Sequence, residues 1–511
     1  MNYKEQTIRS NFKFFGGISI LYGLLFAFCM YRNLFGATFL VYAIATVYVL
    51  DLFIRKVDLK IKKETKMYYM LIIVCGISTC ITSNKPLQFL NWCCVIGLLI
   101  VSMLGQFFDK SNWDIPSYVV NSVILFITTI GYSFLSIKET ENFIKREERR
   151  ENKKVSFVII GVLVALGSLL IILPLLISSD MIFRKVFESL TGWLSFEKMV
   201  PNIQTVLGIL ITALLGFVLI YGFFYACCRV DFSGERQRIV ERCHPIIGIS
   251  FSAVIGVIYL LYSAIQIVYL FFGNAGSLPE GITYSQYARE GFWQLVAVAA
   301  LNIIIVMLCM YLFEENKYLK ILLTIICGCT FVMMASAAYR MYLYVSIYHL
   351  TILRLLVFWF LLILALIMGG VIVSIYKKGF QLVRYIILTS VCGYLIFTMA
   401  RPDYQIAKYN MEHIQDMRAE DLSYMIYGLS LDAAPVIAEK AYDYLSGDDN
   451  YNMKGQLYDY FRTIADNNEE IYFRKANYSR IKAKTAADVY IKEHAEDSIY
   501  SAYYYGDYEY Q

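Results

Sequence analysis

The sequence has little charge for its length. Only 17% of its 511 residues are charged, 58% are hydrophobic, and its mean hydropathy is positive. Because a soluble domain carries about 25% charged residues, this composition excludes an ordinary soluble protein. Apolar runs of roughly 20 residues, enough to cross about 30 Å of hydrocarbon, recur between residues 12 and 400. The fold class we predict is all-α: a polytopic transmembrane helix bundle of 11–12 spans with a small C-terminal α-helical extramembrane domain.

The sequence also lacks the motifs of the common enzyme classes. It contains no Walker loop, G-x-G-x-x-G, H-E-x-x-H or G-x-S-x-G. Its four histidines are scattered, and its twelve cysteines lie before residue 393 without zinc-type spacing. Most of these cysteines fall in apolar runs, so we predict buried thiols. The sequence therefore indicates no metal, no cofactor and no nameable catalytic residue, and it favours a protein without enzymatic activity.

Negative charge is scarce in the first 400 residues and concentrated after them. Residues 401–511 hold 12 Lys and Arg against 20 Asp and Glu, a balance of −8, whereas residues 1–400 hold 34 against 21, a balance of +13. A basic membrane part with an acidic tail argues against nucleic acid as a partner. The expected partners are the lipid bilayer and an envelope or membrane protein that binds the acidic tail.

The basic loops orient the predicted spans. Residues 55–66, 138–154, 229–244 and 376–384 are rich in Lys and Arg and should face the cytoplasm, whereas 31–33, 83–86 and 273–290 are nearly free of them and should face out. The N-terminus is then cytoplasmic. The candidate spans are 13–31, 34–54, 67–83, 86–106, 118–137, 155–178, 202–226, 246–272, 291–313, 319–339, 351–376 and 382–400.

Two interpretations of the early spans remain open. If 55–66 and 138–154 are both cytoplasmic, the three segments between them cannot all cross. The interface-like composition of 118–137 makes this segment our choice for an interfacial one, which gives eleven crossings and an extracellular tail. If instead 138–154 breaks the charge rule, the chain has twelve crossings and a cytoplasmic tail. We prefer eleven crossings.

The regions outside the spans have a helical pattern. Residues 180–200, within the transmembrane domain of 1–400, have apolar residues at helical spacing and predict an amphipathic interfacial helix. Residues 401–490 predict an acidic helical extramembrane domain, with Leu422, Met425, Ile426 and Leu429 on one face of a helix and a turn at 446–450. The Tyr-rich residues 491–511 are predicted to be frayed.

Polar residues at membrane depth are the candidates for a ligand site, because charge is costly there. Glu290, Gln294 and Asn302 share one flank of the helix predicted near 291–313. On a continuous helix, a second group of residues falls within roughly 120° of the surface: Arg340, Tyr344, Tyr348, Thr351 and Arg354. The simpler interpretation of this second group is an aromatic belt with snorkelling arginines at a tight outer hairpin.

Several segments in order resemble a known family. They are LPEGITYSQYAREGFWQLVAVAALN (278–302), YRMYLYVSIYHLTILRLLVFW (339–359), RPDYQIAKYN (401–410), LSLDAAPVI (429–437) and YFRKANYSRIKA (472–483). Over about residues 240–485 the chain is similar to an uncharacterised bacterial multi-pass membrane-protein family of the domain-of-unknown-function class. The resemblance implies a bacterial cell membrane and leaves the activity open.

Three functions follow from these observations. The preferred one is a non-enzymatic sensor, scaffold or envelope-assembly partner that uses the acidic tail. The first alternative is a transporter or permease with a polar path along Glu290, Gln294, Asn302, Arg340 and Arg354. The second alternative is a membrane-embedded transferase, which needs a positioned base or a metal site.

Overall fold

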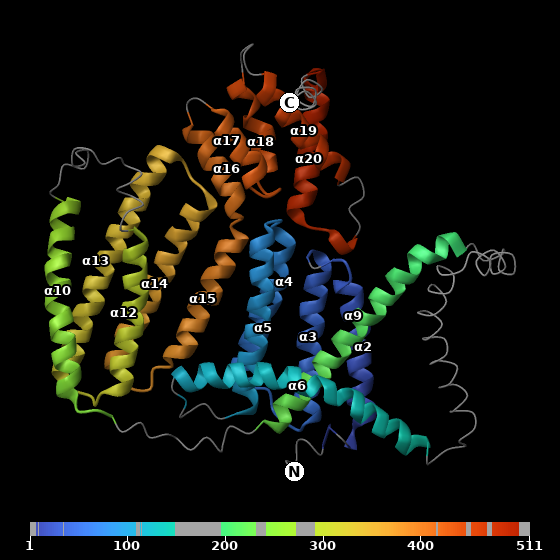
Figure 1. Ribbon diagram of the computed structural model, residues 1–511, viewed down its shortest axis with the longest axis horizontal. Coiled ribbons are helices and arrows are strands. Elements are labelled where there is room, and N and C mark those ends of the chain that lie inside the picture. The colour runs from blue at the N-terminus through green and yellow to red at the C-terminus, as the bar shows by residue number, and fades with distance from the viewer. Residues whose placement is uncertain are drawn as a thin grey trace, which may run out of the picture. The chain divides into compact units, whose positions relative to one another are not determined.

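The computed structural model describes an all-α protein (Figure 1). The described residues are 7–8, 10–33, 35–108, 113, 115–148, 196–230, 242–271, 292–414, 417–445, 451–467 and 473–499. Within these ranges every named element is a helix, and a single isolated bridge joins Cys243 to Phe313. The predicted fold class, an all-α polytopic bundle, is therefore confirmed.

Ten helices of the described ranges are long and apolar enough to cross a membrane. They are α2 (Phe12–Met30), α3 (Ala37–Lys56), α4 (Lys63–Ile81), α5 (Lys85–Phe107), α9 (Phe196–Arg229), α10 (Pro245–Phe271), α12 (Phe292–Leu312), α13 (Lys317–Tyr348), α14 (Ile352–Tyr376) and α15 (Leu382–Met399). They match the predicted spans, except that the predicted span 155–178 lies outside the described residues. Most of the predicted interfacial helix 180–200 also lies outside them, and α9 begins at Phe196.

The predicted interfacial segment 118–137 lies within α6 (Ile115–Glu148). This helix is not among the ten candidate spans of the described chain. Figure 1 shows it running across the direction of α2 and α3. An interfacial position for 118–137 stays a prediction.

The chain forms two compact units. Unit 1 comprises 1–76, 95–232 and 473–475, and unit 2 comprises 77–94, 233–472 and 476–511. Helices α4 and α5 each contribute one end to each unit. The residues of the predicted extramembrane domain fall almost wholly in unit 2, together with α10 and α12–α15, so the boundary predicted at residue 400 stays a prediction.

Unit 1 packs α2 against α3 and α9, and α9 against α6. Gly23 of α2 lets this helix approach the α9 backbone closely, because a Cβ at residue 23 would lie 2.4 Å from the carbonyl oxygen of Ala213 on α9. An aromatic stack fills the centre of this unit: the Phe53 ring lies 4.3 Å from the Phe224 ring and 5.5 Å from that of Phe107. Ring contacts of this kind add about 1 kcal/mol beyond the apolar area that they bury.

One short segment from the far end of the chain also belongs to unit 1. Arg474 in the helical turn η4 (Phe473–Lys475) donates from Nη2 to the Tyr31 carbonyl at 2.6 Å, and Asn33 Nδ2 donates to the Arg474 carbonyl at 2.7 Å. The connection between α2 and α3 is therefore bound to residues 473–475.

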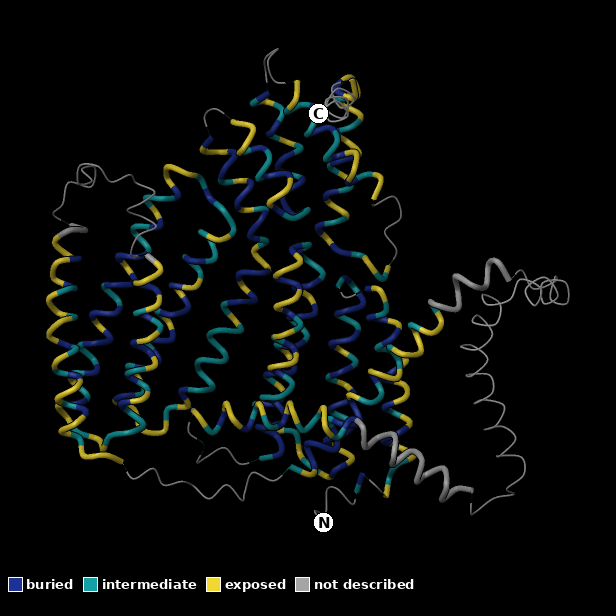
Figure 2. Tube along the Cα trace, viewed as in Figure 1, coloured by how far each residue is buried: buried dark blue, intermediate teal, exposed yellow. Residues whose placement is uncertain are grey.

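Unit 2 exposes apolar side chains along its membrane helices. On α10, Val254, Val257 and Leu261 are 64%, 68% and 65% exposed, and Figure 2 shows exposed residues along much of this helix. Such a surface is stable in lipid, because hydrocarbon tails contact it without the cost of hydrating it. The composition and the exposed faces together describe a multi-pass membrane protein.

The helices after α15 form the second part of unit 2. They are α16 (Pro402–His413), α17 (Ala419–Ser423), the π-helix η1 (Tyr424–Gly428), α18 (Ala434–Lys440), η2 (Tyr442–Leu445), α19 (Tyr451–Asn467), α20 (Tyr478–Glu493) and η5 (Ala495–Asp497). We call α16–α20, with η1 and η2, the platform. Pro402 at the first position suits the start of α16, because its missing N–H has no partner there.

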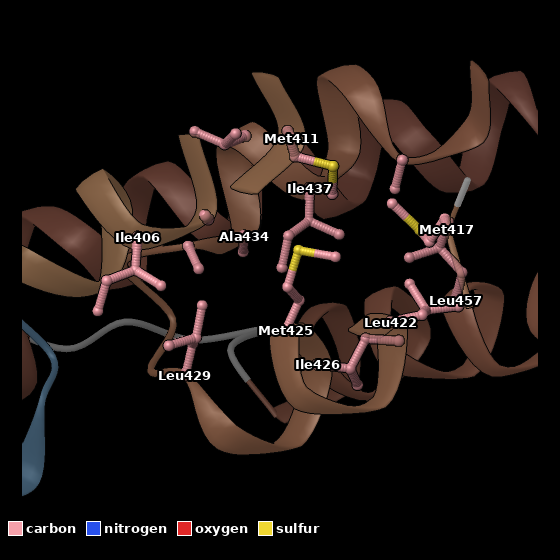
Figure 3. Packing of buried hydrophobic residues seen from close by; sticks show 14 of the residues in the cluster. Ile406, Met411, Met417, Leu422, Met425, Ile426, Leu429, Ala434, Ile437 and Leu457 are labelled. Atoms are coloured by element: carbon pink, nitrogen blue, oxygen red, sulfur yellow. The ribbon is translucent and has the colours of Figure 1, made fainter. Parts of the chain in front are cut away.

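The platform has an apolar core that it shares with the α13–α14 turn. Leu422, Met425, Ile426 and Leu429, which helical spacing places on one face, are all buried, although Leu429 lies just after the π-helix η1 in extended backbone. Figure 3 shows these side chains gathered with residues of α16, α18 and α19. Val345 of α13 and Leu350 of the turn belong to the same cluster. The platform therefore packs directly onto the ends of α13 and α14.

Hydrogen bonds place the platform at the same end of unit 2 as the α4–α5 turn. Thr82 Oγ1 donates to Asp432 Oδ2 at 2.6 Å, and the Ser83 N–H donates to Asp432 Oδ1 at 2.8 Å. Such bonds cannot reach across about 30 Å of hydrocarbon, so residues 83–86 and the platform lie on one side of the membrane. The eleven-crossing interpretation puts both segments outside, whereas the twelve-crossing interpretation separates them.

Candidate functional site

The most densely bonded polar group in unit 2 is the contact between the platform and the α4–α5 turn, which we call the junction. Its centre is Asp432, which is fully buried just before α18. Its carboxylate accepts from the Thr82 hydroxyl at 2.6 Å and from the Ser83 N–H and hydroxyl, both at 2.8 Å. A buried carboxylate is stable only with such partners, so Asp432 fixes the turn to the platform.

Asp403 lies beside Asp432 in the junction. It is 1% exposed, and its Oδ2 accepts from Asn84 Nδ2 at 2.9 Å and from the Ser430 N–H at 3.1 Å. Burial raises the pKa of the Asp403 carboxyl above its ordinary value, and the negative charge of Asp432 raises it further, while the hydrogen bonds from Ser430 and Asn84 lower it. The group therefore keeps its proton to a higher pH than an exposed aspartate.

Asn84 has a second role at the start of α5. Its Oδ1 accepts from the Leu87 N–H at 3.0 Å, which is the bond of a helix N-cap. The same side chain thus begins a span with its oxygen and binds Asp403 with its nitrogen. The sequence SNKP at 83–86 supplies the cap.

The start of α20 binds the other face of the α4–α5 turn. Asn477 Nδ2 donates to the carbonyls of Thr79 and Thr82 at 2.9 and 2.8 Å, and Ser479 Oγ donates to the Ile81 carbonyl at 2.7 Å. Asn477 Oδ1 meanwhile caps α20 by accepting from the Ser479 N–H. The last carbonyls of a helix have no partner within it, and here platform side chains supply the donors.

The α13–α14 turn is held in the same way by α16. Asn410 Oδ1 accepts from the Leu350 N–H at 2.8 Å, and its Nδ2 donates to the Leu350 carbonyl at 2.9 Å. The Tyr424 hydroxyl accepts from the Ile352 N–H at 2.9 Å. Three platform bonds thus satisfy backbone groups of a turn that contains neither Gly nor Pro.

The polar strip predicted on a continuous helix is instead divided by this turn. Helix α13 ends at Tyr348, and His349 has a φ of +60° that reverses the chain. Arg354 on α14 folds back, donates from Nη1 to the carbonyls of Tyr348 and His349, and lies 4.2 Å from the centre of the Tyr344 ring. The continuous-helix geometry was wrong, because left-handed backbone at a non-glycine residue leaves no signal in the sequence.

The structure brings together only part of the predicted strip. The Tyr344 and Tyr348 rings are in contact, with centres 5.0 Å apart and planes tilted by 48°, and Arg354 covers the Tyr344 ring. Arg340 lies two turns earlier on α13 and is half-buried, and Thr351 is the residue before α14. Arg354 binds the carbonyls of Tyr348 and His349 at the end of α13, which is a structural role.

Of the three residues predicted to share a flank of α12, the structure describes Gln294 and Asn302, and it places them in different surroundings. Asn302 is fully buried and bonds to the Tyr259 hydroxyl at 2.8 Å and the Thr330 hydroxyl at 2.9 Å. Gln294 is exposed, and Glu290 lies outside the described residues. Asn302 therefore joins α10, α12 and α13 in a membrane interior, where side-chain hydrogen bonds hold helices together.

Sequence reasoning missed most of the junction. Asp432, Asn410 and Asn477 appear in the quoted segments LSLDAAPVI, RPDYQIAKYN and YFRKANYSRIKA, but no role was predicted for them or for Asn84. The available signals were two helix N-cap patterns, at Asn84 and Asn477. The predicted buried thiols are confirmed for seven cysteines, but Cys93, Cys243 and Cys392 are exposed.

No group of three or more His, Cys, Asp or Glu residues that could hold a metal ion occurs in the described parts of the chain. The two junction carboxylates are buried among hydroxyl, amide and backbone donors. Because these donors occupy both oxygens of Asp432, the arrangement serves to fix backbone segments to each other.

Comparisons with known proteins show the family. A family model described as a domain of unknown function (DUF4153) matches residues 69–440, and the chain belongs to this family. The match begins earlier than the resemblance found in the sequence and ends before residues 472–483. It includes Asn84, Asp403, Asn410 and Asp432 of the junction, whereas Asn477 lies beyond it. Searches of curated proteins and of solved structures gave no significant match.

Proposed function

We propose that this member of the DUF4153 family is a non-enzymatic protein of the bacterial cell membrane that serves as a sensor, scaffold or assembly partner in the envelope. In this proposal the platform lies outside the membrane and binds a partner. The observation that supports it most is the bonding of Asp432 to Thr82 and Ser83. These bonds fix the platform to the spans. A force or a ligand that acts on the platform is therefore transmitted to the spans, and one that acts on the spans is transmitted to the platform.

The charge of the platform favours a basic partner. Outside the stretch 473–487, residues 401–511 hold 7 basic and 20 acidic residues. Potentials of opposite sign steer partners together and exclude partners of like charge. Many of these acidic side chains are exposed: Glu412, Glu420, Glu439, Asp443, Asp466, Asp488, Glu493 and Glu496.

The orientation in this proposal follows from the loop charges. Residues 242–244 and the basic segment 376–384 lie at the end of unit 2 away from the platform, where the Cys243 N–H donates to the Leu312 carbonyl and Lys378 pairs with Glu315. If these segments are cytoplasmic, the platform is extracellular. The N-terminus is cytoplasmic in the same scheme.

The alternative functions have less support. A transport path needs the polar residues of α12 and α13 to line one route, but Asn302 is engaged by Tyr259 and Thr330 and Gln294 lies on an exposed face. A transferase needs a base that can reach its substrate. Asp403, the carboxyl with the raised pKa, is 1% exposed.

Complementation of a strain that lacks the gene tests the proposal. Truncation after residue 403 should abolish function while the spans still insert, as membrane fractionation would show. A sharper variant keeps the platform core and reverses three exposed charges, Glu420→Lys, Glu439→Lys and Asp443→Lys. It should lose function at normal membrane abundance. Glu314→Lys, an equally exposed reversal at the opposite end, is the control. Full function of the truncated chain would sink the proposal.

A further inference from the structure

Two cations share one tyrosine ring where the platform begins. The guanidinium carbon of Arg401 lies 5.1 Å from the centre of the Tyr478 ring and 4.9 Å from that of Tyr404. The ammonium of Lys482, one turn after Tyr478 on α20, lies 6.0 Å from the centre of the Tyr478 ring. Both cations gain from the aromatic face, and an anion that binds near this ring would be attracted by both.

Neither cation has an acidic partner in the described part of the chain. Arg401 Nη2 donates to the Asp432 backbone carbonyl at 3.2 Å, while its buried Nε has no hydrogen-bond partner. A buried donor without a partner costs free energy, so the hydrogen-bonding capacity of the Arg401 guanidinium is only partly used by the described residues. Arg401 also has a φ of +53°, so the backbone holds it in an unusual conformation.

The depth of this group in the membrane is fixed by two spans. Arg401 follows the end of α15 by two residues. Tyr478 is next to Ser479, whose hydroxyl binds the carbonyl of Ile81, the last residue of α4. The cations therefore lie at the level where spans end, which is the level of the lipid headgroups.

The exposed face of α20 suits that level. Tyr478 and Ile481 are each 48% exposed and lie three residues apart, so they share one side of the helix. Residues 476–487 contain three basic residues, Arg480, Lys482 and Lys484, and no acidic one, in a tail whose balance is −8. Basic side chains beside an exposed tyrosine and an apolar residue are complementary to an anionic lipid surface and not to a basic protein.

We propose that Arg401 and Lys482, which both lie near the ring of Tyr478, bind the headgroup phosphate of an anionic phospholipid in the leaflet next to the platform. Arg401 and Lys482 contact the phosphate oxygens, and Tyr478 and Ile481 contact the acyl region beneath it. This lipid site is separate from the acidic surface assigned above to a protein partner, and it places the start of α20 against the bilayer.

Lipid binding by the full-length protein, purified in a non-ionic detergent, tests this site. Titrations of phosphatidylglycerol, phosphatidylcholine and inorganic phosphate are followed by native mass spectrometry and by the thermal unfolding midpoint. We expect phosphatidylglycerol alone to bind and to raise the midpoint. Lys482→Gln should weaken its binding about fivefold, and Arg401→Gln with Lys482→Gln about 25-fold, from about 1 kcal/mol per cation near an anionic surface.

Lys492→Gln is the matched control, an exposed lysine on the last turn of the same helix. It should leave phosphatidylglycerol binding unchanged. The single variant Lys482→Gln keeps the test valid if the double variant fails to fold, because Lys482 is exposed and makes no hydrogen bond in the described chain. Equal binding of phosphatidylglycerol by Lys482→Gln and the unaltered chain would overturn the proposal. So would equal binding of phosphatidylcholine, or an equal effect of inorganic phosphate.

Discussion

At the platform end of unit 2, Asp403 and Asp432 are 1% and 0% exposed, and hydroxyl, amide and backbone donors surround them. At the opposite end, Glu315 is exposed and pairs with Lys320 at 3.0 Å and with Lys378 at 3.3 Å. Both ends of the bundle thus use carboxylates between helices. Asp403 and Asp432 are buried and bonded to neutral donors, whereas Glu315 is exposed to solvent and bonded to two lysines.

The difference teaches which end is structurally fixed. Removing a partner from a buried, bonded charge leaves other groups unsatisfied and costs about 3 kcal/mol or more. Removing an exposed ion pair costs about 0–1 kcal/mol, because water and salt already screen it. The platform end is therefore held by hydrogen bonds that specify one geometry, whereas the opposite end tolerates variation.

The largest effect is expected for Asp432→Ala. It removes the acceptor of three hydrogen bonds and leaves the Thr82 and Ser83 hydroxyls and the Ser83 N–H buried without it, so docking of the platform should weaken by about 3 kcal/mol. Hydrogen exchange over 81–88 and 429–440 measures the change, and exchange should accelerate in both segments. Asp432→Asn keeps an acceptor oxygen, so its exchange rates should lie between those of the unaltered chain and Asp432→Ala. Unchanged exchange in Asp432→Ala would show that the junction does not hold the platform.

Asn410→Ala should have the next largest effect. The Asn410 amide pairs with both backbone groups of Leu350, so its loss leaves one buried donor and one buried acceptor unsatisfied, a cost of about 2 kcal/mol. Faster exchange at the Leu350 amide is the specific readout, because global unfolding would affect all amides together. Lys408→Ala, an exposed change on the same helix, is the control. Equal exchange at Leu350 in both variants would contradict this role of Asn410.

Hydropathy and helical spacing were enough to predict the membrane helices and one face of the platform. Each span is an apolar run of bilayer length, and the buried set Leu422, Met425, Ile426 and Leu429 repeats at helical intervals. Both patterns depend only on residues close together in the chain. The N-caps at Asn84 and Asn477 also depend only on nearby residues, because each asparagine directly precedes its helix, although neither cap was predicted.

The junction and the α13–α14 turn could not be predicted in this way. Asp432 meets Thr82 and Ser83 across about 350 residues of chain, and a lone aspartate in a loop is ordinarily a solvated residue. His349 reverses the chain with a positive φ that commonly belongs to Gly or Asn. Arg354 then covers the end of α13, a contact that a continuous helix would not allow.

The pH dependence of platform docking is expected to be smaller than the effects of Asp432→Ala and Asn410→Ala. A rise in pH should weaken the contribution of Asp403 at the platform end, whereas a fall in pH should weaken that of Glu315 at the opposite end. Because the pKa of Asp403 is raised, the docked state holds that proton more tightly than the undocked state. The stabilisation of docking by the protonated Asp403 carboxyl is present at low pH. It is lost as the pH rises from about 4 through the raised pKa of Asp403. Asp403→Asn, which keeps an acceptor for Asn84, should remove that loss, whereas the exposed change Asp488→Asn should not. Hydrogen exchange over 429–440, measured as a function of pH, compares the two variants with the unaltered chain. Identical pH profiles for Asp403→Asn and the unaltered chain would show that Asp403 is not the group whose titration weakens docking.

The smallest effect is expected for Glu315→Gln at the opposite end. Hydrogen bonds from Lys320, and then from Lys378, lower the pKa of Glu315, so its contribution is present at neutral pH and is lost as the pH falls through that lowered pKa, opposite in sign to Asp403. Because the pair is exposed, we expect a loss of about 0.5 kcal/mol or less in the thermal unfolding of the full chain, and none in high salt. Lys317→Gln, which removes an exposed lysine of the same turn, is the matched control. A loss above about 1 kcal/mol that persists in high salt would mean that Glu315 fixes the α12–α13 and α14–α15 connections as firmly as Asp432 fixes the platform. The contrast between the two ends would then fail.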